Sequence, residues 1–325
     1  MNARGPVDAR HDVTMPQPEE GLLSLPLSRA EVDRSTARRR DTEWLAAAWA
    51  DPATRVVVVE KGQALVRSTG ESEQLVFVSP ERAPDGVRFL LGTGTDGIVY
   101  FGVAGPLPQL DTADADGSGT RPTSLRQAGP LLSDRDVGLM THAVALANWH
   151  AVHGHCPRCG AITEPETAGH SRRCVADRSE HFPRLDPAVI MLVTDRDDRA
   201  LLARNAQWPE RRVSILAGFV EPGESAEQAV AREVLEETGI TVADTRYVGS
   251  QPWPMPHSLM LGFRAQATGS LMITVDDEEI AEASWFSRDE LRAKIASGDI
   301  RLPPPVSIAH RIIESWYGSE LAGAW

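Results

Sequence analysis

The sequence predicts an α+β protein with several structured parts. Strand-like runs dominate residues 40–105, and apolar strand patterns flank an amphipathic helical window near residue 230. All of the cysteines fall in one short stretch between these two regions. We therefore expect a disordered tail over 1–20, a β-rich N-terminal domain over 21–153 that ends in a helix, a cysteine-containing unit over 154–185 and a second domain over 186–325.

The N-terminal half supplies the first group of elements. Residues 1–20 are polar and rich in proline, which is typical of a disordered segment. Strands are expected at Arg55–Glu60, Gln74–Ser79, Arg88–Leu91 and Gly97–Ala104, each bounded by turn residues. Thr112–Thr123 is expected to be a loop, and Asp136–His153 an amphipathic helix.

The cysteine spacing indicates a bound metal. The chain has three cysteines, Cys156, Cys159 and Cys174, in the pattern C-x2-C-x14-C. A zinc ribbon continues with x2-C, and Asp177 stands at that fourth position with a carboxylate oxygen that zinc accepts. His155, His170 and His181 are alternative fourth ligands, and a decayed site with free thiols is the competing interpretation. We expect a structural zinc ion, because the cluster leaves no open position for catalysis.

The C-terminal half alternates strands and helices. Ala188–Thr194 and Ala200–Ala203 are expected to form a hairpin, with further strands at Leu259–Gln266 and Ser284–Phe286. A last helix is expected over Val306–Tyr317, after a run of prolines.

One 23-residue window, Gly218–Ile240, carries the strongest functional signal. Its sequence is GFVEPGESAEQAVAREVLEETGI, and the apolar spacing predicts a helix over Ser225–Thr238 that ends at Gly239. Arg232 and Glu224 are expected to form an ion pair that braces the turn before this helix.

Three carboxylates share one face of that helix. Glu233, Glu236 and Glu237 are spaced i, i+3, i+4, so they repel one another unless a cation lies between them. Mg²⁺ and Mn²⁺ prefer such oxygen ligands, bridge substrate phosphates and lower the pKa of an attacking water. The alternative is a solvated acidic helix face.

A second motif, SQPWPMPHS over residues 250–258, predicts a stiff loop. Its three prolines exclude a helix interior and a central strand, and Trp253 offers a surface for stacking. A proline-rich surface loop with a buried tryptophan is the structural alternative.

These two motifs resemble a known family. The helical window matches the Nudix box, G-x5-E-x7-R-E-U-x-E-E-x-G-U, at every fixed position: Gly218, Glu224, Arg232, Glu233, Val234, Glu236, Glu237, Gly239 and Ile240. The second motif is similar to SQPWPFPxS of the NADH pyrophosphatase (NudC) branch of the Nudix hydrolases, with Met255 in place of Phe. The resemblance implies a Nudix α/β/α sandwich with a mixed sheet, preceded by a zinc ribbon and the N-terminal domain, and it implies a homodimer.

The resemblance also implies site residues. The catalytic metal, Mg²⁺ or Mn²⁺, would contact the backbone of Ala217 and the carboxylates of Glu233, Glu236, Glu237 and Glu279, with Glu278 and Glu282 as rivals to Glu279. The implied substrate-binding residues are Gln251, Pro252, Trp253, Pro254, Met255, Pro256, His257, Ser258, Phe182, Phe219, Arg126 and Ala309. Phe182 and Phe219 are expected to stack on a base.

The implied reaction is hydrolysis of NADH or NAD⁺ to NMNH or NMN plus AMP, with removal of NAD caps from RNA 5′ ends as a related activity. The alternatives are a broader nucleoside diphosphate-X hydrolase, acting for example on ADP-ribose, and a non-catalytic zinc-ribbon regulatory or scaffold protein. The net charge of −13 argues against a basic nucleic-acid-binding surface. The absence of a long apolar run and the cysteine usage lead us to expect a cytoplasmic protein without a membrane span.

Overall fold

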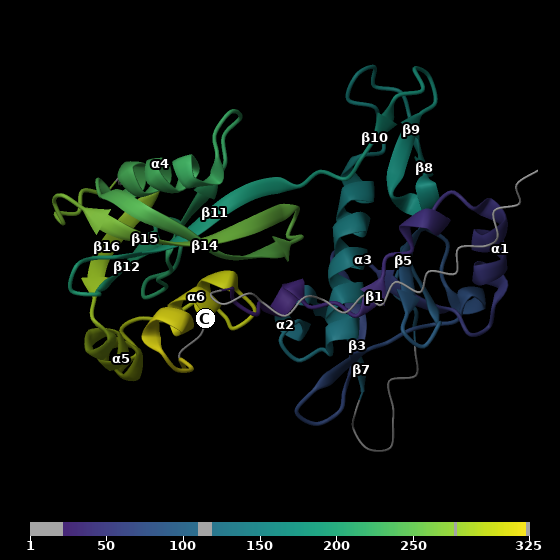
Figure 1. Cartoon of the computed structure of the whole chain (residues 1–325). Coiled ribbons are helices and arrows are strands. Elements are labelled where there is room, and N and C mark those ends of the chain that lie inside the picture. The colour runs from purple at the N-terminus through teal and green to yellow at the C-terminus, as the bar shows by residue number, and fades with distance from the viewer. Residues whose placement is uncertain (1–21, 110–118, 276–277, 323–325) are drawn as a thin grey trace, which may run out of the picture.

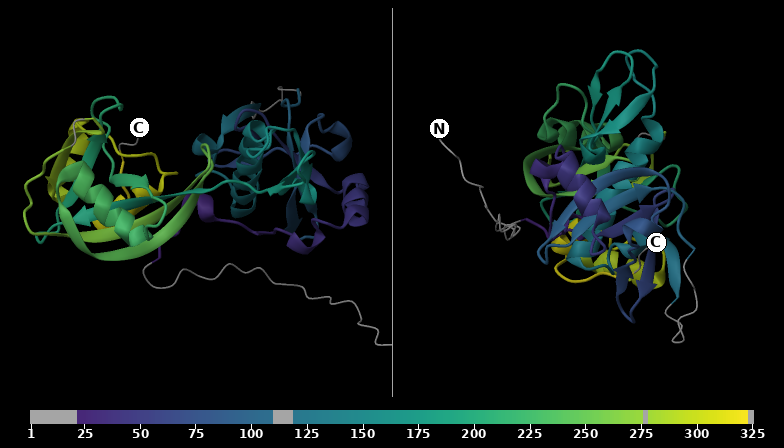
Figure 2. Two further views of the ribbon diagram at one scale, coloured as in Figure 1. Left: turned by 90° about the horizontal axis from the view of Figure 1, so that it is seen from above. Right: turned by 90° about the vertical axis from the view of Figure 1, so that its right-hand side faces the viewer.

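The computed structural model describes residues 22–109, 119–275 and 278–322, so the tail expected over 1–20 lies outside the described residues. Two lobes lie side by side, and a small β unit projects from the N-terminal lobe (Figures 1 and 2). No helix among the described residues is long and apolar enough to cross a bilayer.

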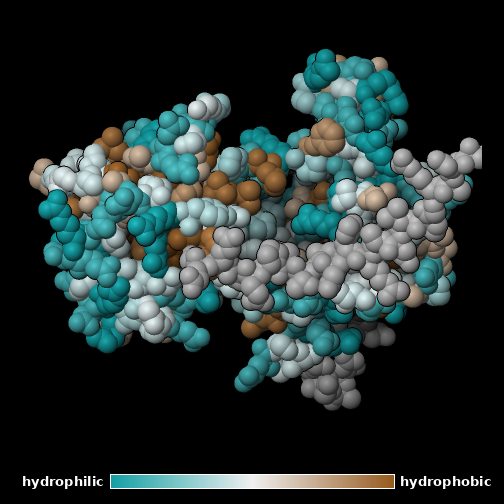
Figure 3. All heavy atoms as spheres, viewed as in Figure 1, coloured by the Kyte–Doolittle hydropathy of each residue, from teal (hydrophilic) through white to brown (hydrophobic). Residues whose placement is uncertain are grey.

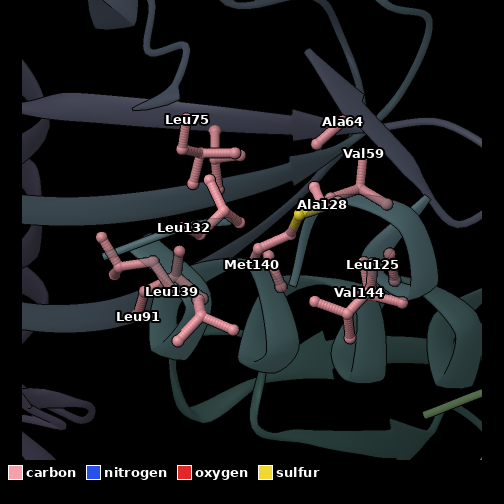
Figure 4. Close-up of a cluster of buried hydrophobic side chains, with 14 of the residues drawn as sticks. Val59, Ala64, Leu75, Leu91, Leu125, Ala128, Leu132, Leu139, Met140 and Val144 are labelled. Carbon is pink, nitrogen blue, oxygen red and sulfur yellow. The ribbon is translucent and has the colours of Figure 1, made fainter. Parts of the chain in front are cut away.

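The N-terminal lobe contains two small sheets around a long helix. The first sheet has the order β1 (Val32–Asp33), β5 (Val87–Gly94), β6 (Val99–Ala104), β2 (Arg55–Val59). The second has the order β4 (Glu73–Leu75), β3 (Gln63–Ser68), β7 (Thr120–Ser124). Helix α3 (Asp134–Val152) buries Met140 and Val144 against residues such as Val59 (Figure 4). The short helices α1 (Thr42–Ala50) and α2 (Leu125–Ala128) complete the lobe.

Several expectations for this lobe are wrong in detail. Strand β7 occupies the end of the expected loop over Thr112–Thr123, of which residues 112–118 lie outside the described part. The strand expected at Gln74–Ser79 ends at Leu75, and β1, β3 and α1 were not expected. Strand β7 gives a weak local signal because it is short, polar and contains Pro122, which an edge strand tolerates. Its pairing with β3 joins segments about 60 residues apart, which no local pattern reveals.

The projecting unit is an antiparallel sheet of β10 (Glu180–His181), β9 (Ser171–Cys174) and β8 (Thr163–Glu166). A 3-10 turn, η4 (Thr167–Gly169), packs it against β5. Gly169 is needed there, because its φ is +82° and a Cβ would lie 2.6 Å from the carbonyl oxygen of Arg88. Buried His150 approaches the Gly169 carbonyl oxygen at 2.9 Å through Nε2, so this histidine fixes the unit to the lobe.

The C-terminal lobe contains a six-stranded sheet. Its order is β14 (Thr241–Trp253), β15 (Ser258–Thr268), β11 (Asp186–Thr194), β12 (Ala200–Asn205), β16 (Ile280–Phe286), with β13 (Leu216–Phe219) paired to β11. Strands β11 and β15 are parallel and the other pairs are antiparallel, which confirms the expected mixed sheet. The expected hairpin is confirmed by the pairing of Thr194 with Ala200.

Alternate side chains of β11 pack against different helices. Val189 and Met191 face α4 (Ala226–Thr238), whereas Ile190 and Leu192 face α6 (Ile308–Tyr317), near α5 (Arg288–Ser297). Helices therefore cover both faces of the sheet, and the expected α/β/α sandwich is confirmed (Figure 1).

The proline-rich segment differs from the expected loop. Strand β14 continues through Pro252 and Trp253, and β15 begins at Ser258, so only residues 254–257 form the turn. Pro252 is tolerated because β14 is the edge strand of the sheet, where a missing N–H is not needed by a further neighbour.

Candidate active site

The box helix places its carboxylates in different environments. Ser225 and Gln228 form a capping box at the start of α4, and Gly239 ends the helix with a φ of +70°. Glu233 and Glu237 are only 9% and 7% exposed, whereas the side chain of Glu236 is 60% exposed. Two of the three carboxylates therefore point into the protein.

The pKa of Glu237 is strongly perturbed. Burial, together with the charges of Glu233, Glu279 and Glu236, raises the pKa of this carboxyl group from its ordinary value to about 8. Its Oε2 is buried and has no hydrogen-bond partner among the described residues. Burial also raises the pKa of Glu233, although Arg232 counteracts that shift.

The neighbouring charges distinguish two of the candidates for the fourth carboxylate. Glu279 acts on the pKa of both Glu233 and Glu237, which places it near the pair. Glu282, one of its rivals, is 75% exposed and forms an ion pair of 3.1 Å with Arg204. The geometry therefore favours Glu279 over Glu282.

Arg232 joins the helix to the turn before it. Its Nε donates to Glu224 Oε1 at 2.7 Å, and its Nη2 donates to the carbonyl oxygen of Phe219 at 2.9 Å. The same guanidinium lies 2.9 Å from Glu233 and 3.0 Å from Glu236. The expected Arg232–Glu224 brace is confirmed.

Gly218 lets strand β13 approach the carboxylates. A Cβ at this position would lie 1.9 Å from Cδ of Glu233, so the glycine leaves the space that the carboxylate fills.

We expect Gly218→Ala to displace Glu233 and to lower kcat/KM by at least about tenfold, because small misplacements of catalytic groups are costly. Steady-state kinetics and Mn²⁺ titration of the variant test this. Unchanged Mn²⁺ affinity and unchanged kcat/KM would contradict it.

A cavity of about 380 Å³ reaches strand β13, although none of the glutamates lines it. It brings together four of the expected site residues, namely Ala217, Trp253, Ala309 and Arg126. The Arg126 guanidinium carbon lies 5.4 Å from the centroid of the Trp253 ring, although the two residues belong to different lobes. Ala217 precedes Gly218 in β13, so one strand connects the cavity with the carboxylates.

The cavity also contains residues that the sequence analysis missed. They are Ile190, Trp208, Arg212, Ser214, Ile215, Met260, Pro303, Pro304, Ser307 and Ile308. Trp208 and Arg212 lie on the connection between β12 and β13, directly before the box. An aromatic and a basic residue at that place could have drawn attention to this segment.

The other expected substrate residues lie elsewhere. Gln251 is fully buried, donates to the Val306 carbonyl oxygen at 3.0 Å and accepts from Leu27 N–H at 3.2 Å, so its amide braces the fold. Pro252 and Ser258 lie in paired strands, and Met255 packs against the N-terminal core. Pro254 accepts a hydrogen bond from α3, and Pro256 and His257 line a separate cavity beside that helix. Phe182 and Phe219 are 64% and 58% exposed, and neither lines the first cavity.

The cysteines and Asp177 converge as expected for a zinc site. One ligand atom each from Cys156, Cys159, Cys174 and Asp177 lie within 4.8 Å of one another. Hydrogen bonds from Ser179 hold the pKa of Asp177 well below its usual range, so its carboxylate is charged. His170 instead contacts the Leu90 carbonyl oxygen at 2.7 Å, where it is committed to the N-terminal lobe.

Comparison with known proteins assigns the chain to a family. Residues 53–149 match the NADH pyrophosphatase-like rudimentary Nudix domain, 152–182 the NADH pyrophosphatase zinc ribbon domain and 184–304 the Nudix domain. A protein of Mycobacterium bovis (strain BCG / Pasteur 1173P2), named NAD-capped RNA hydrolase NudC, is 42% identical over 308 residues, covering 92% of this chain and 97% of the relative. The chain belongs to the NADH pyrophosphatase (NudC) family of Nudix hydrolases.

Other relatives extend across distant organisms. The human protein named NAD-capped RNA hydrolase NUDT12 is 31% identical over 337 residues, which cover 89% of this chain and 72% of that protein. The solved structure of a Nudix hydrolase from Nitrosomonas europaea is 22% identical, covers 51% of this chain and 94% of its own, and superposes with a TM-score of 0.40.

The residues of this NudC-family chain fit a divalent cation. The unpartnered, buried Oε2 of Glu237 is an oxygen that a hard cation would satisfy. Burial and then the charges of three neighbouring carboxylates raise the pKa of Glu237, and a cation would relieve the repulsion among the carboxylates. Among the described residues, only the cysteine cluster has three or more ligand atoms within 4.8 Å of one another, so the glutamates form a more open site.

Proposed function

We propose that this chain is a metal-dependent NAD(H) pyrophosphatase that hydrolyses NADH or NAD⁺ to NMNH or NMN plus AMP, and that it also removes NAD caps from RNA 5′ ends. The observation that carries the proposal is strand β13, in which Ala217 lines the aromatic cavity while Gly218 packs against Glu233. A place for a base therefore adjoins a place for charged phosphates. The names of the bacterial and human relatives support the substrate class.

Some residues of the site would take part in the reaction, and others would hold them in position. Mg²⁺ or Mn²⁺ held by Glu233, Glu236, Glu237, Glu279 and the Ala217 carbonyl would supply Lewis-acid charge to the diphosphate. Glu237 would also accept the proton of the attacking water, since its buried Oε2 has no other hydrogen-bond partner among the described residues. Arg232 holds the helix and the preceding turn in register through Glu224.

Two further features belong to the proposal. Zinc in the Cys3Asp cluster would serve as a structural clip and would not take part in the reaction.

The enzyme would act in the cytoplasm as a homodimer. Exposed apolar side chains support the dimer, including Phe182, Leu185 and Val152 near the base of the ribbon, and apolar surface gathers along the junction of the lobes in Figure 3.

A product assay tests the proposal directly. Purified protein incubated with NADH, NAD⁺ or an NAD-capped RNA in Mg²⁺ or Mn²⁺ is expected to release AMP or 5′-monophosphorylated RNA. ADP-ribose serves as the comparison substrate for the broader diphosphate hydrolase. Release of no AMP from any substrate with either metal would overturn the proposal and would favour a non-catalytic role.

Trp253→Ala separates the dinucleotide activity from general hydrolysis. The ring lines the cavity beneath Arg126. Its loss is therefore expected to misplace the nicotinamide end of NADH and to lower kcat/KM for NADH by about 100-fold. Activity on ADP-ribose, which lacks the nicotinamide, is expected to fall much less. Measurement of kcat/KM on both substrates decides the point, and equal losses would show that the tryptophan is only scaffolding.

A further inference from the structure

The turn between β14 and β15 is held by the N-terminal lobe. Trp253 and Met255 pack against the hydrophobic core that α3 forms with the N-terminal strands. Asn148, on α3, donates from Nδ2 to the carbonyl oxygen of Pro254 at 2.8 Å. The tip of a hairpin in the C-terminal lobe is therefore fixed from the other lobe.

The composition of the turn explains why it needs an external donor. Pro252, Pro254 and Pro256 have no N–H, so the segment has few groups with which to make the backbone hydrogen bonds of an ordinary turn. Met255 N–H donates to the Trp253 carbonyl oxygen at 2.7 Å, and Asn148 supplies the next hydrogen bond. The side-chain amide of Asn148 thus satisfies a carbonyl oxygen of the turn from the other lobe.

The other contacts of the hairpin leave this role to Asn148. Gln251 anchors the base of the hairpin through the Val306 carbonyl oxygen and Leu27 N–H. Arg126 lies over the ring of Trp253 on the cavity side. Between these two points, Asn148 fixes the backbone one residue beyond Trp253. A shift of Pro254 would consequently move the indole that lines the cavity.

We propose that Asn148 is a positioning residue through which the N-terminal lobe sets the orientation of Trp253. The orientation of this ring in turn sets the affinity for the nicotinamide end of the dinucleotide. The inference rests on the proposed function, because it assigns the cavity at Trp253 to that end of the substrate. It gives the rudimentary Nudix domain a specific task in the active site.

Three variants test the proposal. Asn148→Leu keeps the approximate volume and removes the donor, whereas Asn148→Gln keeps an amide donor. Ser28→Ala is the matched control, since Ser28 Oγ donates to the Ser250 carbonyl oxygen at 3.1 Å and joins the N-terminal segment to β14 without reaching the turn. KM and kcat are measured for NADH and ADP-ribose, together with the inhibition constant of NMN and the thermal unfolding midpoint.

Asn148→Leu is expected to raise KM for NADH and the inhibition constant of NMN about three- to tenfold, the effect of one lost hydrogen bond. In Asn148→Leu, kcat, KM for ADP-ribose and the unfolding midpoint should stay close to wild type. Asn148→Gln should recover part of the lost affinity for NADH and NMN. Ser28→Ala should leave all of these quantities unchanged. In a double-mutant cycle with Trp253→Ala, the losses on NADH should not add.

Two results would overturn the proposal. An unchanged KM for NADH in Asn148→Leu would show that the hydrogen bond does not position the ring. Equal losses on NADH and ADP-ribose would show a general structural role. Both differ from failure of the proposed function, in which the wild-type protein itself would release no AMP.

Discussion

Glu237→Gln is expected to reduce kcat on NADH by at least about 100-fold, the effect of losing a positioned acid–base group. The substitution keeps the shape of the side chain and removes one metal-binding charge. A parallel loss is expected for Glu233→Gln, because both carboxylates are buried on the same face of α4. Near-normal rates in both variants would show that this helix is not the active site.

The pH dependence of stability separates catalytic loss from misfolding. In the metal-free protein, the pKa of Glu237 is raised from an ordinary 4.5 to about 8, chiefly by burial. The folded state therefore keeps a proton that the unfolded chain releases between these values, and this stabilisation is present below pH 4.5 and lost as the pH rises through 8.

Glutamine carries no charge at either end of this range. In EDTA, the unfolding midpoint of Glu237→Gln is thus expected to fall less than that of wild type between pH 5 and pH 8, when measured by thermal denaturation. An inactive variant that is at least as stable as wild type at pH 8 would assign the lost rate to the site. A midpoint that falls more steeply than that of wild type would mean that the carboxylate is not held in its protonated form.

Local patterns predicted the parts of this structure that local interactions determine. The helix at Ser225–Thr238 carries its own capping box and terminal glycine, so its limits follow from the sequence. The C-x2-C-x14-C spacing likewise brings ligand atoms together across two short turns, with Asp177 beside them. The hairpin at Thr194 and Ala200 needs only its two strands and a turn.

Contacts between distant segments were not accessible in the same way. Nothing near Asn148 indicates that it reaches Pro254, more than 100 residues further along the chain. The cavity combines Arg126 of one lobe with Trp208 of the other, and only the folded arrangement joins them. Glu279 could not be separated from its neighbours by spacing, because the choice depends on which carboxylate acts on Glu237 in the folded chain.

Loss of zinc from the cysteine cluster is expected to lower the stability of the protein strongly. Metal analysis of the purified protein is expected to give about one zinc per chain, as in other sites with four protein ligands. Cys159→Ser is expected to abolish zinc retention and to lower the unfolding midpoint by more than about 5 °C, because binding free energy at a structural zinc site is folding free energy. The ribbon also packs against β5 through η4, so its loosening would reach the N-terminal lobe.

The identity of the fourth ligand can be tested by a matched pair of variants. Asp177→Ala is expected to weaken zinc retention strongly, because the Asp177 carboxylate lies 3.8 Å from Cys156 Sγ within the cluster. His170→Ala is expected to keep the metal, since Nε2 of this histidine contacts the Leu90 carbonyl oxygen and serves the docking of the ribbon. Zinc content after dialysis against a chelator measures both. Loss of zinc in His170→Ala with retention in Asp177→Ala would reverse the assignment, and equal retention in both would show that the three cysteines hold the ion without either residue.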